Sequence, residues 1–574
     1  MEQFVEVSNG AEAFIELLNA NGVEYIFMNP GTDTYSVQEA VCKLKATGRQ
    51  TPEVIVSLHE YVGMSAAHGH FLVSGKPQVV FVHTTLGPQQ IGGGLHNAQR
   101  RRIGVVVCSG RVPANLDGDT GQVRTVGVHW DQEQFDQAGP MRGFVKWDYE
   151  VRSTHSMHHV VQRAFRVAKS EPCGPVYISL PQDWLMEKID GVKILPQERH
   201  GAVSTPQADS NLLEQAAGIL VAAKNPLIIT GHSGRRSNSV ASLIALAETL
   251  GAGVISSQTW MNFPTTHPLY LGHEPGAYIS DADAILVIDH DVPWVPKKTR
   301  LGADANIIFL DIDAIKENLP MWGFPVDIYL QGDSSKTLPI LNRIVAQQIS
   351  TERKAVISDR FEQIEQTHKR MFAAYREAAM KDVDSTPISS EWLCHCIDET
   401  IDENTLVIEE VTTNRNAVLH QLQRTKPETY WTGGTSLGFA LGGALGVKLA
   451  APDKTVVSLI GDGSFVFGCP TASLWAAAAY KIPFLTIIFN NGQYTAPKVA
   501  LRWEMGKESY SDKCGPWVGT DISPSPDYAA IARGCHCFGQ TVTEPAEVKS
   551  ALKIALAQVQ GGMPAVLDVR VAGL

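Results

Sequence analysis

Residues Thr455–Gln493, TVVSLIGDGSFVFGCPTASLWAAAAYKIPFLTIIFNNGQ, are the stretch from which the fold is best predicted. The stretch contains two apolar, β-branched runs, Val456–Ile460 and Phe484–Phe489, separated by an alanine-rich segment of helical composition. Continuously apolar runs are typical of parallel strands that are buried on both faces. The stretch therefore predicts a strand–helix–strand unit of a parallel sheet.

Polar residues follow each of these predicted strands directly. Gly461–Ser464 (GDGS) comes after the first strand, and Asn490–Asn491 comes after the second. Parallel strands present their carboxyl ends at one edge of a sheet, and ligands bind there. Asp462 and Asn491 offer the oxygen ligands that Mg²⁺ prefers, while Ser464 opens a helix whose first amides favour an anion. From the spacing alone, a magnesium–diphosphate site and an ordinary strand-to-helix turn are equally good interpretations.

The same alternation of buried strands and helical segments extends along the whole chain. Polar segments at 196–209 and 346–386 interrupt it, and we expect the second to be a solvated helical connection. The pattern predicts an α/β protein with three doubly wound parallel-sheet domains, at 1–190, 205–345 and 387–574. The other predicted strands are Glu24–Met28, Glu53–Ser57, Gln78–Val82, Gly104–Val107, Val176–Leu180, Pro226–Thr230, Ala284–Ile288, Asn306–Leu310, Leu406–Glu409 and Ala565–Val569.

Composition excludes several classes of protein. The 574 residues include 48 Lys and Arg against 60 Asp and Glu, a net charge of −12, so there is no basic footprint for nucleic acid. No apolar run reaches the length of about 18 residues that a membrane-spanning helix needs. The first residues are acidic where a secretory signal needs bases, and the odd count of 9 cysteines favours reduced thiols. We therefore expect a cytoplasmic enzyme with neither nucleic acid nor membrane as a partner.

The GDGS and NN clusters, with a strand–helix–strand stretch between them, resemble the signature of thiamine diphosphate (ThDP)-dependent enzymes. Acetolactate synthase and benzoylformate decarboxylase belong to this family. The resemblance implies that Asp462, Asn491 and the backbone carbonyl of Gln493 hold Mg²⁺, and that Gly463 and Ser464 contact the diphosphate. The stretch between the clusters is slightly longer than in the family, and we expect the extra residues near 468–470.

Upstream residues extend the resemblance to the cofactor's other contacts. The run Ser436–Leu441 (SLGFAL) matches the family's glycine-rich helix, and it places Leu437 where these enzymes have an apolar wedge under the cofactor. Without the family, Leu437 would be interpreted as a core leucine. Thr412 follows the Leu406–Glu409 strand and would meet the diphosphate from the other side; a helix N-cap is an equally good interpretation.

The N-terminal part carries the predicted catalytic residues. Glu60 follows a strand and enters a largely apolar helix, where the resemblance implies the glutamate that exchanges a proton with the cofactor's pyrimidine. Taken alone, Glu60 would be a solvated first-turn acid. His83 closes the Gln78–Val82 strand, at the position where benzoylformate decarboxylase carries a proton-shuttling histidine; the alternative is a surface histidine. We predict Glu60 and His83 as catalytic.

The resemblance implies decarboxylation of a 2-oxo acid, acyloin-type carboligation, or both, as in acetolactate synthase. A 2-hydroxyacyl-CoA lyase is the alternative within the family. Relatives build the site between two subunits, so a homodimer or homotetramer is expected. In the predicted middle domain, Gly231–Arg236 (GHSGRR) follows a strand where some relatives bind FAD or a CoA nucleotide, but a structural turn explains it equally well.

Two alternatives lie outside ThDP enzymes. Gly434–Gly438 (GTSLG) has the G-x-S-x-G pattern of a serine hydrolase, with Asp462 and His536 following in hydrolase order. That elbow needs a buried strand before the serine, and Tyr430–Gly433 (YWTG) is a poor one. The other alternative is a non-catalytic relative, which the presence of Glu60 disfavours.

Overall fold

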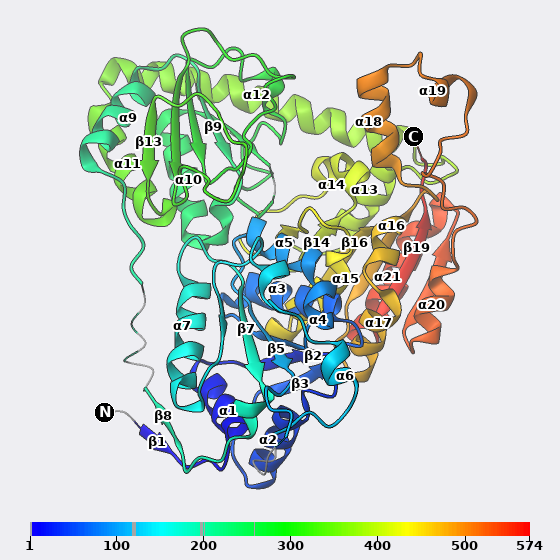
Figure 1. Cartoon of the computed structure of the whole chain (residues 1–574). Coiled ribbons are helices and arrows are strands. Elements are labelled where there is room, and N and C mark those ends of the chain that lie inside the picture. Colours follow the sequence, from blue (N-terminus) through cyan, green and yellow to red (C-terminus); the bar gives the residue numbers. More distant parts are fainter. Residues whose placement is uncertain are drawn as a thin grey trace.

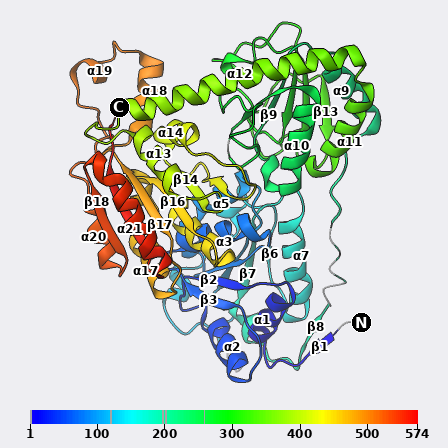
Figure 2. The same ribbon diagram turned by 180° about the vertical axis from the view of Figure 1, so that it is seen from behind.

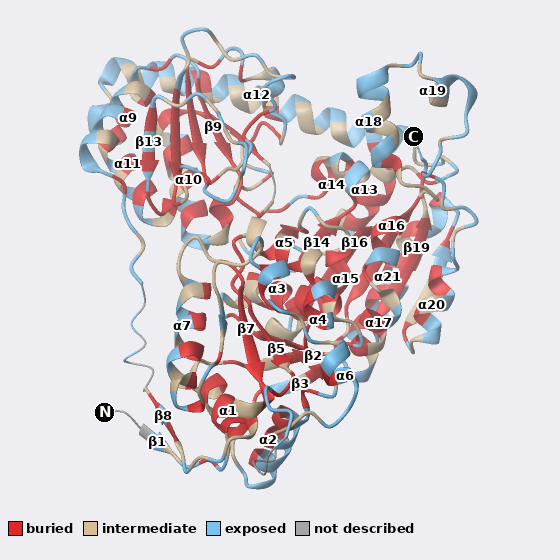
Figure 3. Cartoon of the chain, in the orientation of Figure 1, coloured by how far each residue is buried: buried red, intermediate tan, exposed pale blue. Residues whose placement is uncertain are grey.

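Three parallel sheets with helices on their faces form the molecule (Figure 1), so the predicted α/β class is confirmed. The computed structural model describes residues 3–117, 122–195, 199, 201, 203–257 and 259–573. Continuous burial of the central strands, shown in Figure 3, explains why they could be recognised as apolar runs.

The N-terminal sheet has six strands in the order β3-β2-β4-β5-β7-β6. Its strands are β2 (Tyr25–Met28), β3 (Glu53–Val56), β4 (Val79–Val82), β5 (Val106–Arg111), β6 (Asp148–Glu150) and β7 (Val176–Pro181). Its helices are α1 (Gly10–Ala20), α2 (Tyr35–Ala46), α3 (Glu60–Ser74), α4 (Leu86–Gln90), α5 (Gly92–Arg100), α6 (Val128–Asp131), α7 (Met157–Lys169) and α8 (Gln182–Met186). A small antiparallel pair, β1 (Gln3–Val5) and β8 (Val192–Ile194), lies beside it and was not predicted.

The middle sheet has five parallel strands in the order β10-β9-β11-β12-β13. They are β9 (Pro226–Thr230), β10 (Gly253–Ser256), β11 (Ala284–Ile288), β12 (Asn306–Asp311) and β13 (Ile328–Gln331), accompanied by α9 (Ser210–Ala222), α10 (Ser237–Leu250) and α11 (Ser334–Gln348). The following helix α12 (Thr351–Lys381) is largely exposed and runs from this sheet toward the C-terminal one (Figures 1 and 2). It confirms the expected helical connection.

The C-terminal sheet has six strands in the order β15-β14-β16-β17-β19-β18. They are β14 (Leu406–Glu410), β15 (Tyr430–Thr432), β16 (Val456–Gly461), β17 (Leu485–Asn490), β18 (Phe538–Val542) and β19 (Ala565–Arg570). The helices are α13 (Ser390–Thr400), α14 (Arg415–Gln421), α15 (Phe439–Ala450), α16 (Asp462–Phe467), α17 (Pro470–Ala479), α18 (Thr495–Met505), α19 (Tyr510–Cys514), α20 (Tyr528–Gly534) and α21 (Val548–Gln560).

Helices α3 and α15 join the first and third sheets at very close range. A side chain at Gly446 would place its Cβ 1.8 Å from the carbonyl oxygen of Ala66, and one at Gly69 would lie 2.1 Å from that of Gly443. Glycine is therefore required where the two backbones meet. This contact brings the starts of both helices, which carry predicted site residues, into one region of the molecule.

The division at 1–190, 205–345 and 387–574 places one parallel sheet in each unit, and we keep these boundaries as a proposal. In the predicted 196–209 linker, residues 196–198, 200 and 202 lie outside the described residues. Among the described residues, no helix combines the length and apolar character that a membrane span requires.

Candidate functional site

A cavity of about 80 Å³ lies at the carboxyl end of the C-terminal sheet. The turns after β14, β16 and β17 form it together with the loop before α15. It collects every cofactor and metal residue predicted for this part of the chain: Thr412, Leu437, Asp462, Gly463, Ser464, Asn491 and Gln493. The structure thus brings together residues that are far apart in sequence, as the parallel-sheet argument predicted.

Backbone amides that follow strands β16 and β17 donate hydrogen bonds to the Asp462 carboxylate. Its Oδ1 accepts from the Gly463 amide at 2.8 Å, and its Oδ2 accepts from the Gly492 amide at 2.7 Å. Burial raises the pKa of the Asp462 carboxyl despite these hydrogen bonds, which act in the opposite direction. A cation beside the carboxylate would offset the cost of burying its charge.

Asn491 and Gln493 lie on the turn after β17, which Gly492 permits with its φ of +68°. The Asn491 side chain donates from Nδ2 to Thr495 Oγ1 at 3.0 Å, and its Oδ1 accepts from the Gln493 amide at 3.2 Å. The Gln493 side chain accepts from Lys498 Nζ. Asn491 and Gln493 therefore line the same cavity as Asp462.

The helical part between the two clusters differs from the prediction. We expected Ser464 to open a helix, but α16 already begins at Asp462. The helix ends at Phe467, and α17 begins at Pro470 after Cys469 takes a φ of +50°. This break falls at 468–470, where the additional residues were expected.

Leu437 and Thr412 border the cavity on its other sides. Leu437 is partly exposed, so it is not the core leucine of the alternative interpretation. Its carbonyl accepts from the hydroxyl of Tyr61 at 2.6 Å. Thr412 has a φ of +38° and is the first residue of a 3₁₀ turn whose N-cap is Val411, so Thr412 is not the N-cap of the alternative interpretation.

Glu410 anchors the Leu437 loop and was missed from the sequence. Its carboxyl accepts from the amides of Gly438, at 2.5 Å, and Ala440, at 2.7 Å. Burial raises the pKa of Glu410 to about 8. The available signal was an acid at the carboxyl end of β14, two residues before Thr412.

Glu60 and His83 lie at the corresponding edge of the N-terminal sheet. Glu60 is the first residue of α3, directly after His59, whose Nδ1 accepts from the Tyr61 amide at 3.1 Å. His83 follows β4 and is partly buried. The hydrogen bond to Asp33 contributes most to raising the pKa of His83, and the negative charge of Glu60 makes a smaller contribution. Among the described residues lining the 80 Å³ cavity, neither Glu60 nor His83 is found.

The C-terminal edge fits a magnesium–diphosphate group on its donor chemistry. The residues that line the cavity include the buried carboxylate of Asp462 and the side-chain amide of Asn491, whose oxygens are hard donors of the kind that Mg²⁺ prefers. Gly463 is needed there, because a Cβ at this position would lie 2.4 Å from the Tyr494 ring.

Comparisons with known proteins agree along the chain. "Thiamine pyrophosphate enzyme, N-terminal TPP binding domain" matches residues 8–139, the corresponding central domain matches 213–341, and the C-terminal TPP binding domain matches 411–569. The chain belongs to the thiamine pyrophosphate enzyme family. ThDP enzymes of its decarboxylase and acetolactate synthase branch are its relatives.

Individual relatives cover almost the whole chain. Benzoylformate decarboxylase of Pseudomonas aeruginosa is 27% identical over 95% of this chain and 96% of its own length. Acetolactate synthase isozyme 3 large subunit of Escherichia coli is 25% identical over 99% and 96%. A ThDP-dependent 4-hydroxybenzoylformate decarboxylase of Rhodococcus jostii superposes with a TM-score of 0.79 at 24% identity, covering 99% of this chain and 100% of its own, which supports the fold.

The structure does not assemble the hydrolase alternative. Among the described residues no hydrogen bond joins His536 to Ser436 or Asp462, and His536 lines a different cavity, beside His59. The Gly231–Arg236 loop of the middle sheet is bonded to this chain's own groups: the Gly234 amide donates to Asn262 Oδ1 at 2.8 Å. That contact supports the structural-turn interpretation.

Proposed function

We propose that this ThDP-family enzyme is Mg²⁺-dependent and acts on a 2-oxo acid, by decarboxylation, acyloin-type carboligation, or both. The observation that carries the proposal is the pair of sheet edges. One gathers oxygen donors at Asp462 and Asn491, and the other carries Glu60 and His83, to which we assign proton exchange. The similarity to benzoylformate decarboxylase and acetolactate synthase supports this substrate class.

Each residue has a defined task in this proposal. Asp462, Asn491 and the Gln493 carbonyl would hold Mg²⁺, Gly463, Ser464 and Thr412 would bind the diphosphate, and Leu437 would support the cofactor's bend. ThDP, when bound, supplies a carbon nucleophile and a sink for electrons. Glu60 would exchange a proton with the pyrimidine, and His83 would exchange one with the substrate-derived group.

We further propose that a second copy of the chain completes the site. Leu58, Leu86, Val466 and Phe467 are exposed beside the two edges, between 45% and 52%. Exposed apolar side chains that gather near a site mark an interface. Pairing two copies would place Glu60 and His83 of one against the cavity of the other. Sedimentation at several protein concentrations would detect the dimer or tetramer, and a monomer at all concentrations would contradict it.

Turnover with purified protein tests the substrate class. With ThDP and Mg²⁺ present, we expect CO₂ release from benzoylformate or pyruvate, and loss of activity after chelation. Cleavage of a 2-hydroxyacyl-CoA without turnover of either 2-oxo acid would instead establish the lyase alternative.

A further inference from the structure

Beyond the predicted residues, the buried acid Asp33 pairs with the partly buried His83. Asp33 lies in the turn after β2 and is 1% exposed. Its Oδ1 is hydrogen-bonded to His83 Nδ1, and its Oδ2 accepts from the Thr84 amide at 2.8 Å. Thr84 has a φ of +28°, so Asp33 also holds a backbone conformation that side-chain-bearing residues rarely adopt. Both carboxylate oxygens are thereby engaged by the segment that carries the histidine.

Two glycines make room for this pair. A Cβ at Gly31 would lie 2.2 Å from His83 Nδ1, and a Cβ at Gly110 would lie 2.0 Å from Asp33 Oδ2. Gly31 belongs to the same turn as Asp33, whereas Gly110 comes from the neighbouring strand β5. A side chain at Gly31 would displace His83, and one at Gly110 would displace Asp33. Two separate elements of the fold therefore leave space for the Asp33–His83 contact.

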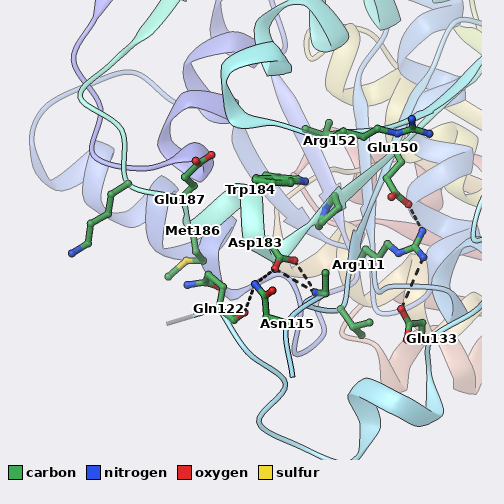
Figure 4. Close-up of a pocket in the computed structure, with 15 residues that line it drawn as sticks. Arg111, Asn115, Gln122, Glu133, Glu150, Arg152, Asp183, Trp184, Met186 and Glu187 are labelled. Atoms are coloured by element: carbon green, nitrogen blue, oxygen red, sulfur yellow. Dashed lines mark hydrogen bonds and ion pairs between the residues drawn. The ribbon is translucent and has the colours of Figure 1, made fainter. Parts of the chain in front are cut away.

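The other ring nitrogen of His83 faces Gln132. His83 Nε2 lies 3.0 Å from Gln132 Oε1. The next residue, Glu133, is fixed by Arg124 at 2.5 Å and by Arg111 at 4.0 Å, and Figure 4 shows Arg111 between Glu133 and Glu150. These ion pairs hold the segment that carries Gln132 in place. Glu133 also lines the cavity of about 1100 Å³ shown in Figure 4, so this cavity lies next to the segment that carries Gln132.

We propose that Asp33 is the positioning residue that fixes His83 as the enzyme's proton-exchanging group, with Nδ1–H donated to Asp33 and Nε2 left to exchange the proton. This inference deepens the proposed function and rests on it for the role of His83. When Nε2 is protonated, Gln132 Oε1 accepts from it; when it is not, rotating the Gln132 amide by half a turn presents N–H donors instead. The proton given up at Nε2 is regained from water.

The charged surroundings of His83 are consistent with this role. Asp33 and Glu60 both favour its protonated form, and burial alone opposes it. A second histidine near Asp33, His129, differs: burial and the charge of Arg124 lower its pKa, whereas that of His83 is raised.

Nuclear magnetic resonance of the cofactor-free protein, with labelled histidine rings, tests the proposal. His83→Ala identifies the His83 signal among the 18 histidines. In the wild-type protein, neutral His83 should carry its proton on Nδ1, and its pKa should lie above the ordinary value. Asp33→Asn should lower that pKa by about one unit or more, because it removes an opposite charge in contact. Asp131→Asn removes an exposed charge beside Gln132 and should leave the pKa unchanged.

Two results would overturn the assignment. One is a neutral His83 with its proton on Nε2 in the wild-type protein, a measurement for which His83→Ala serves only to assign the signal. The other is an unchanged His83 pKa in Asp33→Asn. Gln132→Glu adds a carboxylate at Nε2 and should raise the pKa. None of these readouts requires ThDP or turnover, so failure of this proposal and failure of the proposed 2-oxo acid activity are distinguishable.

Discussion

The N-terminal and C-terminal sheets have the same topology but different chemistry at equivalent positions. Numbered in chain order within each sheet, both read 2-1-3-4-6-5. The second strand of each leads into one of the two helices, α3 and α15, that pack together. Equivalent strand ends therefore carry Asp33 and Glu410, Glu60 and Leu437, and His83 and Asp462.

This comparison separates what the scaffold fixes from what the side chains add. The shared topology brings the carboxyl ends of the strands to one edge of each sheet, and the predicted site residues of both sheets lie at that edge. The N-terminal edge carries Glu60 and His83, which we propose exchange protons, whereas the C-terminal edge carries oxygen donors around a cavity. The equivalent acids also differ: Asp33 contacts a histidine, while Glu410 accepts from the backbone amides of Gly438 and Ala440 and has a pKa raised by burial.

The largest effect is expected when the Asp462 carboxylate is removed from the edge of the C-terminal sheet. Asp462→Ala should abolish binding of ThDP with Mg²⁺, because no other carboxylate lines the cavity among the described residues. In wild-type protein, the cofactor should raise the free energy of unfolding by about 2.7 kcal/mol at a hundredfold excess over Kd. Thermal unfolding measures this. Asp453→Ala, before rather than after β16, is the control, and a cofactor-dependent shift retained by Asp462→Ala would refute the metal assignment.

A methyl group at the diphosphate turn should weaken binding without abolishing it. Gly463→Ala would put a Cβ 2.4 Å from the Tyr494 ring, so the ring must move out of its place in the cavity wall. We expect Kd for ThDP to rise about tenfold, which is about 1.4 kcal/mol, by calorimetry. Gly461→Ala meets no atom within 4 Å and should bind normally. Equal affinities of the two variants for ThDP would show that the cofactor does not bind against the Tyr494 wall of the cavity.

Glu410 should make the free energy of unfolding fall as the pH rises, whereas an acid that is paired with a cation makes it rise. Its folded pKa of about 8 exceeds its ordinary value of 4.5, so the unfolded chain loses this proton first. This group's contribution therefore declines as the pH rises from about 4.5 to 8. Glu410→Gln should lose stability less than wild type between pH 5 and pH 8, in thermal unfolding without cofactor. Parallel curves for the two proteins would contradict the buried, protonated state.

The smallest effect is expected at Ser436. Its backbone is held by Asn97, with the Ser436 amide donating to Asn97 Oδ1 at 2.8 Å, and the hydroxyl has no predicted role. Ser436→Ala should therefore keep kcat/KM close to wild type. Labelling of Ser436 by a serine-reactive phosphonate, with loss of activity, would restore the hydrolase alternative.

Most of the fold could be predicted because its central strands are buried on both faces. All twelve predicted strands are present. The strands that were missed within the three sheets lie at sheet edges: β6, β10, β13, β15 and β18. An edge strand such as Ile328–Gln331 alternates between buried and exposed residues, and Asp148–Glu150 is polar, so neither forms an apolar run.

The site could be predicted only where a local motif carries it. The GDGS and NN clusters can each be recognised from a few consecutive residues that follow a predicted strand. Asp33 and Glu410 do not, because their partners, His83 and Gly438, lie 50 and 28 positions away in sequence. The parallel-sheet argument brings such residues to one edge, but only the folded chain shows which of them touch.

Proton exchange at C2 of bound ThDP tests the division between the two edges most directly. Glu60→Gln keeps the size and hydrogen-bonding capacity of the side chain but cannot exchange the proton, and it leaves the C-terminal edge untouched. We predict that ThDP and Mg²⁺ still bind to this variant, while hydrogen–deuterium exchange at C2, measured by nuclear magnetic resonance after acid quench, slows by about 10²–10⁴-fold. Exchange at the wild-type rate in the bound cofactor would contradict the assignment of proton chemistry to the N-terminal edge.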